Sequence, residues 1–270
     1  MKIAIFCVNY NSYDSLHQYL ASIDKALEAT QSPIELKVIV ADNTSPALPV
    51  RYTPRHFTLN VLITGGNKGY FGAVRIAMQQ VSPADFDYAI ISNVDVLISI
   101  GFFTQLLESK LDTTTVGWIA PEIYSQSLGF DFNPQAIEPY SLKKLKALRL
   151  MFKYPWLLRV KQKLLYKYHD IKDVPSGPIY VGHGSFLILT KSFFIHCGII
   201  NYPIFLYGEE IYLAETCKRH HLQVVYEPAI KVIDIGRVST GKILFRQYCK
   251  YNYKAIDYII KTFYENDSHT

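Results

Sequence analysis

The chain has 270 residues, of which 49% are hydrophobic and 19% are charged. This length and composition are enough to bury one large core and exclude extensive disorder, and no stretch approaches the roughly 20 apolar residues of a membrane-spanning helix. The net charge of +5 favours an anionic partner but does not choose among nucleotide, nucleic acid and lipid headgroup.

Strands alternate with helices along the first 120 residues. The apolar run at residues 3–8 is too short for a signal peptide and predicts a first strand. Leu16, Leu20, Ile23 and Leu27 then recur at helical spacing. Further apolar runs predict strands at 36–41, 57–63, 86–92 and 116–120, with helices at 72–81 and 97–107. Such alternation indicates an α/β fold with a mostly parallel sheet covered on both faces.

Polar loops follow four of these strands, at residues 9–12, 42–46, 65–69 and 93–95. The carboxyl ends of parallel strands open at one edge of a sheet, which is where open α/β sheets bind ligands. Asp95 is the carboxylate that ends the polar tip after the apolar run 88–91. By itself this pattern is weak, because most aspartates after strands cap the next helix.

The second half of the chain contains a basic segment and a closing helix. Between residues 140 and 172, ten Lys and Arg residues are mixed with Leu, Trp and Tyr, against the single acid Asp170. Three interpretations remain open: an amphipathic helix pair with a solvated basic side, a patch that lies on an anionic membrane, or a nucleic-acid site. Strands are expected within 180–190 and at 222–226, and a final helix over roughly 241–264.

The four cysteines are Cys7, Cys197, Cys217 and Cys249, and none has Cys-x-x-Cys spacing. Their separation argues against a zinc site or a disulfide framework and predicts reduced thiols in a cytosolic protein. Neither GxGxxG nor GxxxxGK[ST] spacing occurs in the glycine-rich loop 65–69, so dinucleotide and P-loop sites are not expected.

Six motifs occur in an order that resembles family 2 of the inverting glycosyltransferases, especially its rhamnosyltransferase-like members that assemble bacterial surface polysaccharides. They are residues 8–12 (VNYNS), 42–45 (DNTS), 67–72 (NKGYFG), 92–95 (SNVD), 205–210 (FLYGEE) and 234–239 (DIGRVS). The resemblance implies a GT-A fold, a Rossmann-like mixed sheet flanked by helices. One domain would span residues 1–270, with a basic aromatic helical insert at 140–175 and a C-terminal helix at 241–264.

The resemblance also implies a nucleotide-diphospho-sugar donor and a divalent cation, Mn²⁺ or Mg²⁺. Asp95 matches the family's metal-binding aspartate, and Asn93 stands where the usual motif has another Asp. Asp234 occupies the position of a metal-ligating His. Its oxygen suits a hard cation, so Asp234 is expected to be a metal ligand; the alternative is that this ligand has been lost.

Glu209 and Glu210 match the family's Glu-Asp pair, whose second member is the catalytic base. An inverting transfer needs such a base to take the proton of the acceptor hydroxyl, which assigns this role to Glu210, and Glu209 is expected to orient acceptor hydroxyls. The alternative for both is a favourable interaction with the dipole of the helix that they begin.

Nucleotide and donor-sugar contacts are expected from residues of the strand-end loops and of a later strand: Asn9, Tyr10, Asp42, Asn67, Gly69, Asn93 and His183. Tyr10 is suited to stack on the base and Asp42 to accept from a base N–H or a ribose hydroxyl. His183 has either a structural role or a contact with acceptor or diphosphate. Arg237 and Lys242 are candidates for neutralising the diphosphate.

The sequence therefore predicts a cytoplasmic, metal-dependent inverting glycosyltransferase, either free in the cytoplasm or peripheral on the inner face of the cytoplasmic membrane. It would move a hexose or deoxyhexose from a UDP- or dTDP-sugar to a glycan acceptor in surface-polysaccharide assembly, and a polyprenyl-linked glycan is one candidate acceptor. The alternatives are a degenerate, non-catalytic glycan- or membrane-binding subunit, since Asn93, Asp234 and Glu210 depart from the commonest residues, and, less favoured, a nucleotidyltransferase.

Overall fold

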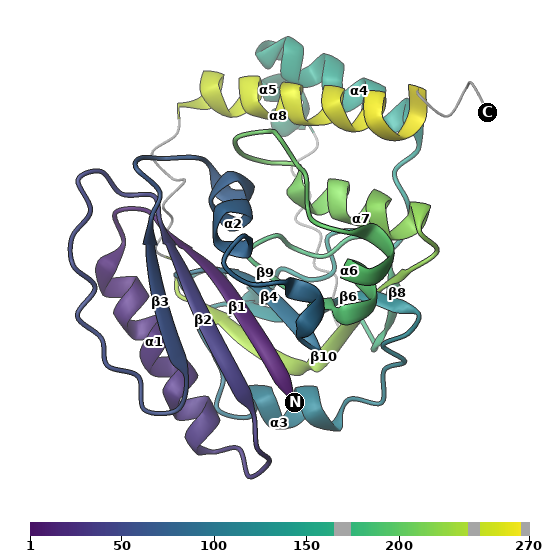
Figure 1. The fold of residues 1–270 in the computed structure, drawn as a ribbon. Helices are drawn as coiled ribbons and strands as arrows, with labels where there is room; N and C mark the ends of the chain where they lie inside the picture. Colours follow the sequence, from purple (N-terminus) through teal and green to yellow (C-terminus); the bar gives the residue numbers. More distant parts are fainter. Residues whose placement is uncertain (165–173, 237–243, 266–270) are drawn as a thin grey trace.

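The structure is a computed structural model that describes residues 1–164, 174–236 and 244–265. Its strands form one mixed sheet in the order β3-β2-β1-β4-β9-β6-β10-β5, with β7 beside β6 and β8 beside β10 (Figure 1). The strands are β1 (Lys2–Asn9), β2 (Glu35–Asp42), β3 (Thr58–Ile63), β4 (Tyr88–Asn93), β5 (Val96–Ile98), β6 (Val116–Ser125), β7 (Phe130–Asp131), β8 (Gly177–Ile179), β9 (Phe186–Thr190) and β10 (Gln223–Asp234).

Helices cover both faces of this sheet. They are α1 (Tyr13–Glu28), α2 (Tyr70–Met78), α3 (Phe102–Glu108), α4 (Leu142–Lys153), α5 (Pro155–Leu164), α6 (Lys191–Cys197), α7 (Glu209–Arg219) and α8 (Phe245–Ile260), with a 3₁₀ turn at Pro83–Asp85 and a π-helical turn at Lys261–Glu265. The predicted fold class, a mixed α/β sheet flanked by helices, is confirmed.

Alternation along β1 shows how the sequence builds two cores. Ile3 and Ile5 pack with α1 and α3 on one face, whereas Ala4 and Phe6 pack with α2, α6 and α7 on the other. Successive side chains of a strand point to opposite faces, so a strand with both faces covered is apolar throughout. This explains why the run 3–8 lacks the polar alternation of a half-exposed strand.

The first four strands of the sheet, β3-β2-β1-β4, are parallel, with Asn9 opposite Asp42 at their carboxyl ends. β9 then pairs antiparallel with both β4 and β6. The polar loops after β1, β2, β3 and β4 consequently meet at one edge, as the sequence predicted.

The prediction of a helix over 97–107 is wrong in its first half. Residues Val96–Ile98 form β5, which pairs antiparallel with β10, and the helix begins only at Phe102. A short apolar run has no periodicity that separates strand from helix, and here the free edge of β10 decides the outcome. β10 is also longer than the predicted strand 222–226, because it continues to Asp234.

Helices α4, α5 and α8 form a separate layer at the end of the molecule beyond α7 (Figure 1). They have their own apolar core, which includes Leu145, Phe152, Cys249 and Ile256. An ion pair of 2.8 Å between Arg149 and Asp257 joins α4 to α8. We call these three helices the helix layer. The predicted insert at 140–175 corresponds to α4 and α5 together with residues outside the described part of the chain.

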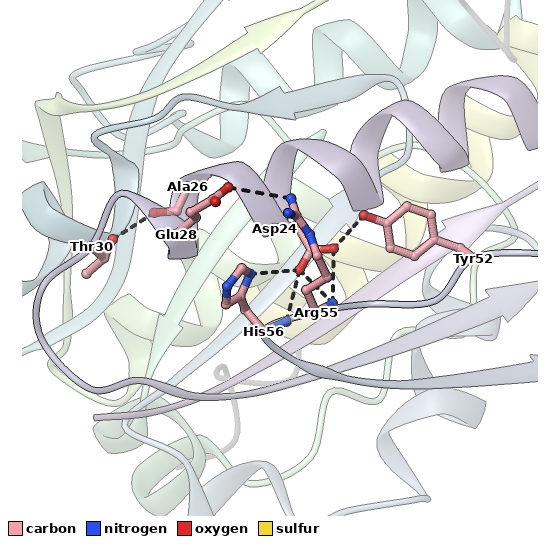
Figure 2. A network of polar contacts seen from close by, with 7 residues as sticks. All are labelled: Asp24, Ala26, Glu28, Thr30, Tyr52, Arg55 and His56. Atoms are coloured by element: carbon pink, nitrogen blue, oxygen red, sulfur yellow. Dashed lines mark hydrogen bonds and ion pairs between the residues drawn. The ribbon is translucent and has the colours of Figure 1, made fainter.

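A buried carboxylate ties the loop between β2 and β3 to α1. Asp24 accepts hydrogen bonds from the hydroxyl of Tyr52 (2.6 Å) and from the backbone N–H groups of Arg55 and His56 (each 3.1 Å), and Figure 2 shows these contacts. The network holds the long loop against the molecule while its other end, at residues 43–45, contributes to the edge of the sheet. No helix within the described residues is long and apolar enough to cross a membrane.

Candidate active site

A cleft of about 620 Å³ opens at the carboxyl ends of the parallel strands. Its size is that of a small-molecule or cofactor site. Eight of the residues predicted from the sequence line it: Tyr10, Asn67, Gly69, Asn93, Asp95, His183, Glu209 and Glu210. The structure thus brings the metal candidate Asp95, most donor candidates and the base candidates together in one cavity, whereas the second metal candidate, Asp234, does not line it.

Asn9 and Asp42 do not line the cleft, because both are fully buried behind it. One carboxylate oxygen of Asp42 accepts hydrogen bonds from the Asn9 side chain (3.1 Å) and the Thr44 backbone N–H (3.0 Å), and the other accepts from the Tyr13 hydroxyl (2.7 Å). In this conformation the two residues hold the loops after β1 and β2 together. Their predicted contact with a nucleotide stays a prediction.

Asn43 is a cleft residue that the sequence analysis did not identify. Its amide nitrogen donates to the carbonyl of Gly69 (3.0 Å), and its amide oxygen accepts from the Thr64 hydroxyl (2.8 Å) and the Lys68 N–H (3.3 Å). It therefore joins the loop after β2 to the loop before α2. Its position directly after Asp42, within one of the six motifs, was the available signal.

Gly69 brings the loop before α2 against the segment 205–207. Its φ of 77° is in the left-handed region, and a Cβ at this position would overlap the carbonyl oxygen of Phe205. That same carbonyl accepts a hydrogen bond from the Tyr70 N–H (3.2 Å). Only glycine permits both the dihedral angle and the close approach.

Asp95 and Asp234 form the acidic end of the site. Asp95 lies in the turn between β4 and β5, Asp234 lies opposite Val96 at the end of β10, and the Ile235 N–H donates to the Asp95 carbonyl (3.1 Å). Burial, together with the nearby charge of Asp234, raises the pKa of Asp95 to about 6. Two carboxylates in a poorly solvated place repel one another, and a divalent cation with oxygen ligands relieves that repulsion.

These two aspartates therefore fit the divalent cation that the sequence motifs imply. They supply hard oxygen ligands but not a full coordination shell, because no group of three or more His, Cys, Asp or Glu side chains suited to a metal occurs in residues 1–164, 174–236 and 244–265. The remaining ligands would come from substrate oxygens and water, as is usual for Mg²⁺.

Glu209 and Glu210 begin α7 and line the cleft together with Gln247 and Tyr251 of α8. Burial and the adjacent Glu210 charge raise the pKa of Glu209 to about 8, and one of its carboxylate oxygens has no hydrogen-bond partner within the described residues. Burial also raises the pKa of Glu210, although nearby backbone N–H groups, including that of Gly184, oppose the rise. Glu209 is buried and Glu210 half-buried, and a carboxyl pair with raised pKa values in a cleft is typical of acid–base chemistry rather than of a simple helix cap.

Because Gly184 has no side chain, the carboxylate of Glu210 can pack directly against its backbone. A Cβ on Gly184 would lie 2.9 Å from Cγ and 3.0 Å from Oε1 of Glu210, closer than such atoms approach in proteins. The Gly184 carbonyl also accepts a hydrogen bond from the Tyr70 hydroxyl (3.1 Å). The segment 183–185 therefore fixes where the carboxylate of Glu210 can be.

Replacing Gly184 with Ala should displace Glu210 by a few tenths of an ångström and lower the turnover number by about 10- to 100-fold, because small misplacement of a reacting group is costly. Steady-state kinetics together with donor affinity measure this effect, and donor affinity should be nearly unchanged. Gly101→Ala is the matched control, since no atom lies within 4 Å of a Cβ there. Equal activity of both variants would contradict this placement of Glu210.

His183 is held as a neutral ring. Its Nδ1 accepts the Ser185 N–H (3.2 Å), its ring stacks on Phe132 at 4.8 Å, and its backbone N–H donates to Asn133 (2.6 Å). Burial lowers the pKa of His183 to about 4. Because Nδ1 accepts, the proton of the neutral ring is on Nε2, which makes that atom a hydrogen-bond donor.

Part of the cleft lining is largely aromatic and was not predicted. It consists of Phe205, Tyr207 and, from α8, Gln247 and Tyr251, with the rings of Phe205 and Tyr251 5.4 Å apart. No local sequence signal marks these α8 residues as part of the site, because they reach it through tertiary packing. Arg237 and Lys242, the candidates for diphosphate contacts, lie outside the described residues.

No protein-family model matches the chain. It is 26% identical over 253 residues to an N-acetylglucosaminyl-diphospho-decaprenol L-rhamnosyltransferase of Mycobacterium tuberculosis, covering 89% of this chain and 78% of that protein. It is 22% identical over 223 residues to the low-salt glycan biosynthesis hexosyltransferase Agl10 of Haloferax volcanii, covering 82% of this chain and 63% of that protein.

Solved structures show the same fold at low identity. S. aureus TarS 1-349 superposes with a TM-score of 0.53 at 9% identity, over 99% of this chain and 74% of that one. GalNAc-T7 with UDP, GalNAc and Mn²⁺ superposes with a TM-score of 0.55 at 10% identity, over 100% and 58%. The chain is a distant homologue of the Mycobacterium tuberculosis rhamnosyltransferase and has the GT-A fold.

Proposed function

We propose that this protein is a metal-dependent inverting glycosyltransferase that transfers a hexose or deoxyhexose from a UDP- or dTDP-sugar to a glycan acceptor in surface-polysaccharide assembly. One observation carries the proposal: a single cleft holds a buried acidic strand end, at Asp95, and a carboxyl pair, of which Glu209 is buried and Glu210 is half-buried. The first suits the diphosphate of a donor through a cation, and the second suits the deprotonation of an acceptor.

Glu210 acts as the base in this mechanism. Its carboxylate takes the proton of the acceptor hydroxyl while the acceptor oxygen bonds to the anomeric carbon and the bond from that carbon to the diphosphate breaks. The electron pair of the broken bond leaves with the nucleoside diphosphate. Attack on the face opposite the leaving group inverts the anomeric centre.

Asp95 and Asp234 would hold Mn²⁺ or Mg²⁺, which when bound stabilises negative charge on the departing diphosphate. His183 donates from Nε2 to a donor oxygen, because its depressed pKa keeps the ring neutral at physiological pH. Glu209, protonated over much of that range, uses its unpartnered oxygen to bind and orient a sugar hydroxyl.

The acceptor in this proposal is a polyprenyl-linked glycan at the inner face of the cytoplasmic membrane. The name of the Mycobacterium tuberculosis relative specifies an N-acetylglucosaminyl-diphospho-decaprenol acceptor, and this relative aligns with 89% of the chain. The bound UDP, GalNAc and Mn²⁺ of GalNAc-T7 support a metal-assisted nucleotide-sugar donor. The choice of sugar and base is left to experiment.

Thermal denaturation with UDP, dTDP, GDP and CDP, each with Mn²⁺, Mg²⁺ or EDTA, tests the donor site. A ligand at 100 times its dissociation constant stabilises the native state by about 2.7 kcal/mol, or on the order of 5 °C for a chain of this size. One diphosphate should raise the midpoint only with metal present. No response to any nucleotide would favour the rival function, a non-catalytic glycan- or membrane-binding subunit.

Replacing Asp95 with Asn should remove the metal-dependent part of this nucleotide response, since an amide is a weaker ligand than a carboxylate for a hard cation. The same denaturation panel measures the loss, which should equal the difference between the Mn²⁺ and EDTA curves of the natural protein. Asp85→Asn, at an exposed position in the 3₁₀ turn, is the control and should keep the full response. An undiminished response in Asp95→Asn would remove Asp95 from the metal site.

A further inference from the structure

The helix layer holds the positive charge of the molecule. α4, α5 and α8 contain eleven of the 28 Lys and Arg residues but only one of the 23 Asp and Glu residues, Asp257. The remainder of the chain is therefore net negative, although the protein as a whole is net positive. Asp257 is already paired with Arg149 (2.8 Å) and Lys261 (2.7 Å), so it does not offset the other charges.

The outer face of α4 alternates basic and apolar side chains. Lys143, Lys146, Leu150 and Lys153 are all exposed and recur three or four residues apart, and the exposed Tyr154 directly follows the helix. The opposite face of α4 holds Leu145 and Phe152 in the layer's core. Residues with this spacing share one side of a helix, so the exposed stripe is a continuous surface rather than scattered positions.

Large apolar side chains are exposed beside the basic residues of this layer. Trp156, in the first turn of α5, is 64% exposed, Leu150 is 52% exposed, and Leu244, directly before α8, is 70% exposed. Exposed Trp and Leu among Lys and Arg are typical of helices that lie in the interface of an anionic bilayer. A nucleic-acid surface requires the basic residues but gives no reason for the exposed Trp and Leu.

The helix layer also adjoins the cleft. Gln247 and Tyr251 of α8 line the cavity, while Arg246, Lys250 and Lys254 of the same helix are exposed. A surface that covers the layer would therefore lie beside the cleft mouth formed by α8. A substrate anchored in that surface would need to extend only past α8 to reach Glu210.

We propose that the helix layer docks on an anionic lipid bilayer, with the α4 stripe and Trp156 at the interface, and so presents the cleft to a lipid-linked acceptor. The proposed binding to the bilayer is inferred from the charge and exposure of the three helices. Only the second part, that the bound protein places its cleft near a lipid-linked acceptor, rests on the proposed function. The basic side chains are attracted to the anionic headgroups, and the exposed Trp is buried in the bilayer interface. Binding should therefore weaken with added salt and with loss of that Trp.

Sedimentation of the full chain with phosphatidylglycerol and phosphatidylcholine vesicles tests the docking without any sugar donor. The natural protein should bind the anionic vesicles at 0.1 M salt, and less at 0.5 M. The double variant Lys143→Glu/Lys146→Glu should bind at least about tenfold more weakly, because two attractive charges become repulsive. Trp156→Ala should also weaken binding.

The controls carry matched changes elsewhere on the surface. Lys25→Glu/Lys110→Glu reverses two exposed lysines, in α1 and after α3, and Ile195→Ala truncates a side chain that is 61% exposed on α6. Both should bind anionic vesicles like the natural protein. Equal binding to the two kinds of vesicle, equal loss in variants and controls, or equally tight binding to duplex DNA would overturn the proposal.

The rate of sugar transfer to a soluble short-chain acceptor, compared with that to an acceptor embedded in vesicles, distinguishes the bilayer proposal from the proposed enzymatic function. The Lys143→Glu/Lys146→Glu variant should transfer to that acceptor at the natural rate but lose transfer to acceptors embedded in anionic vesicles. Vesicle binding without transfer to either acceptor would refute the enzymatic function and leave the docking intact. Natural rates with embedded acceptors in this variant would overturn the presentation of acceptor by the layer.

Discussion

The Glu210→Gln variant should lose sugar transfer by about 10²- to 10⁴-fold, the usual contribution of a general base. An amide has nearly the shape of the carboxylate but cannot take the acceptor proton. Since the role proposed for Glu210 is toward the acceptor and not the donor, the affinity for the nucleoside diphosphate should change little. Single-turnover transfer and nucleotide-dependent thermal shift measure the two quantities separately.

Two companion variants make the Glu210 result specific. Glu210→Asp keeps the carboxylate but shortens it by one methylene, so it should retain more transfer than Glu210→Gln. Gly184→Ala, which crowds the same carboxylate, should fall between the natural protein and Glu210→Gln. Transfer within tenfold of the natural rate in Glu210→Gln would exclude Glu210 as the base, and loss of nucleotide binding would indicate a general defect of the site.

The sequence predicted the parts of the fold that depend on local patterns. The apolar runs of β1 and β4 are continuous because helices cover both faces of the sheet, and the polar tip that ends at Asp95 follows directly from where β4 stops. The pair Glu209-Glu210 was visible because it begins a helix after a recognisable lead-in. The predicted helix at 97–107 failed at β5, because the free edge of β10 lies more than 120 residues away in the sequence.

The site was predictable where its residues belong to local sequence motifs, such as the strand-end loops and the start of α7. Asn43 was missed although it follows Asp42, since sequence alone does not tell which of two adjacent side chains faces the cavity. Asp42 itself turns inward, where the Tyr13 hydroxyl and the Asn9 amide satisfy it. Gln247 and Tyr251 come from a helix that reaches the cleft through packing with α4, and such long-range placement leaves no local pattern.

Replacing Glu209 with Gln should stabilise the protein at pH 8 while it weakens transfer. The pKa of Glu209 is raised from its ordinary value near 4.5 to about 8 by burial and by the Glu210 charge, so between these pH values the folded state holds a proton that the unfolded state has released. The free energy of unfolding of the natural protein therefore falls as the pH rises through this window. The neutral amide has no such dependence.

The stabilisation by Glu209→Gln should be small near pH 4.5 and grow to about 1–3 kcal/mol at pH 8. This is less than the shift alone would give, because the buried amide also needs hydrogen-bond partners. Denaturant unfolding at several pH values measures the difference, with the exposed Glu108→Gln as a control that should show no growth with pH. A difference that is constant with pH, or destabilisation at pH 8, would contradict the protonated state of Glu209. Greater stability together with poorer transfer would mean that the unpartnered buried carboxyl of Glu209 lowers the stability of the substrate-free protein. Its role would then be to bind the substrate.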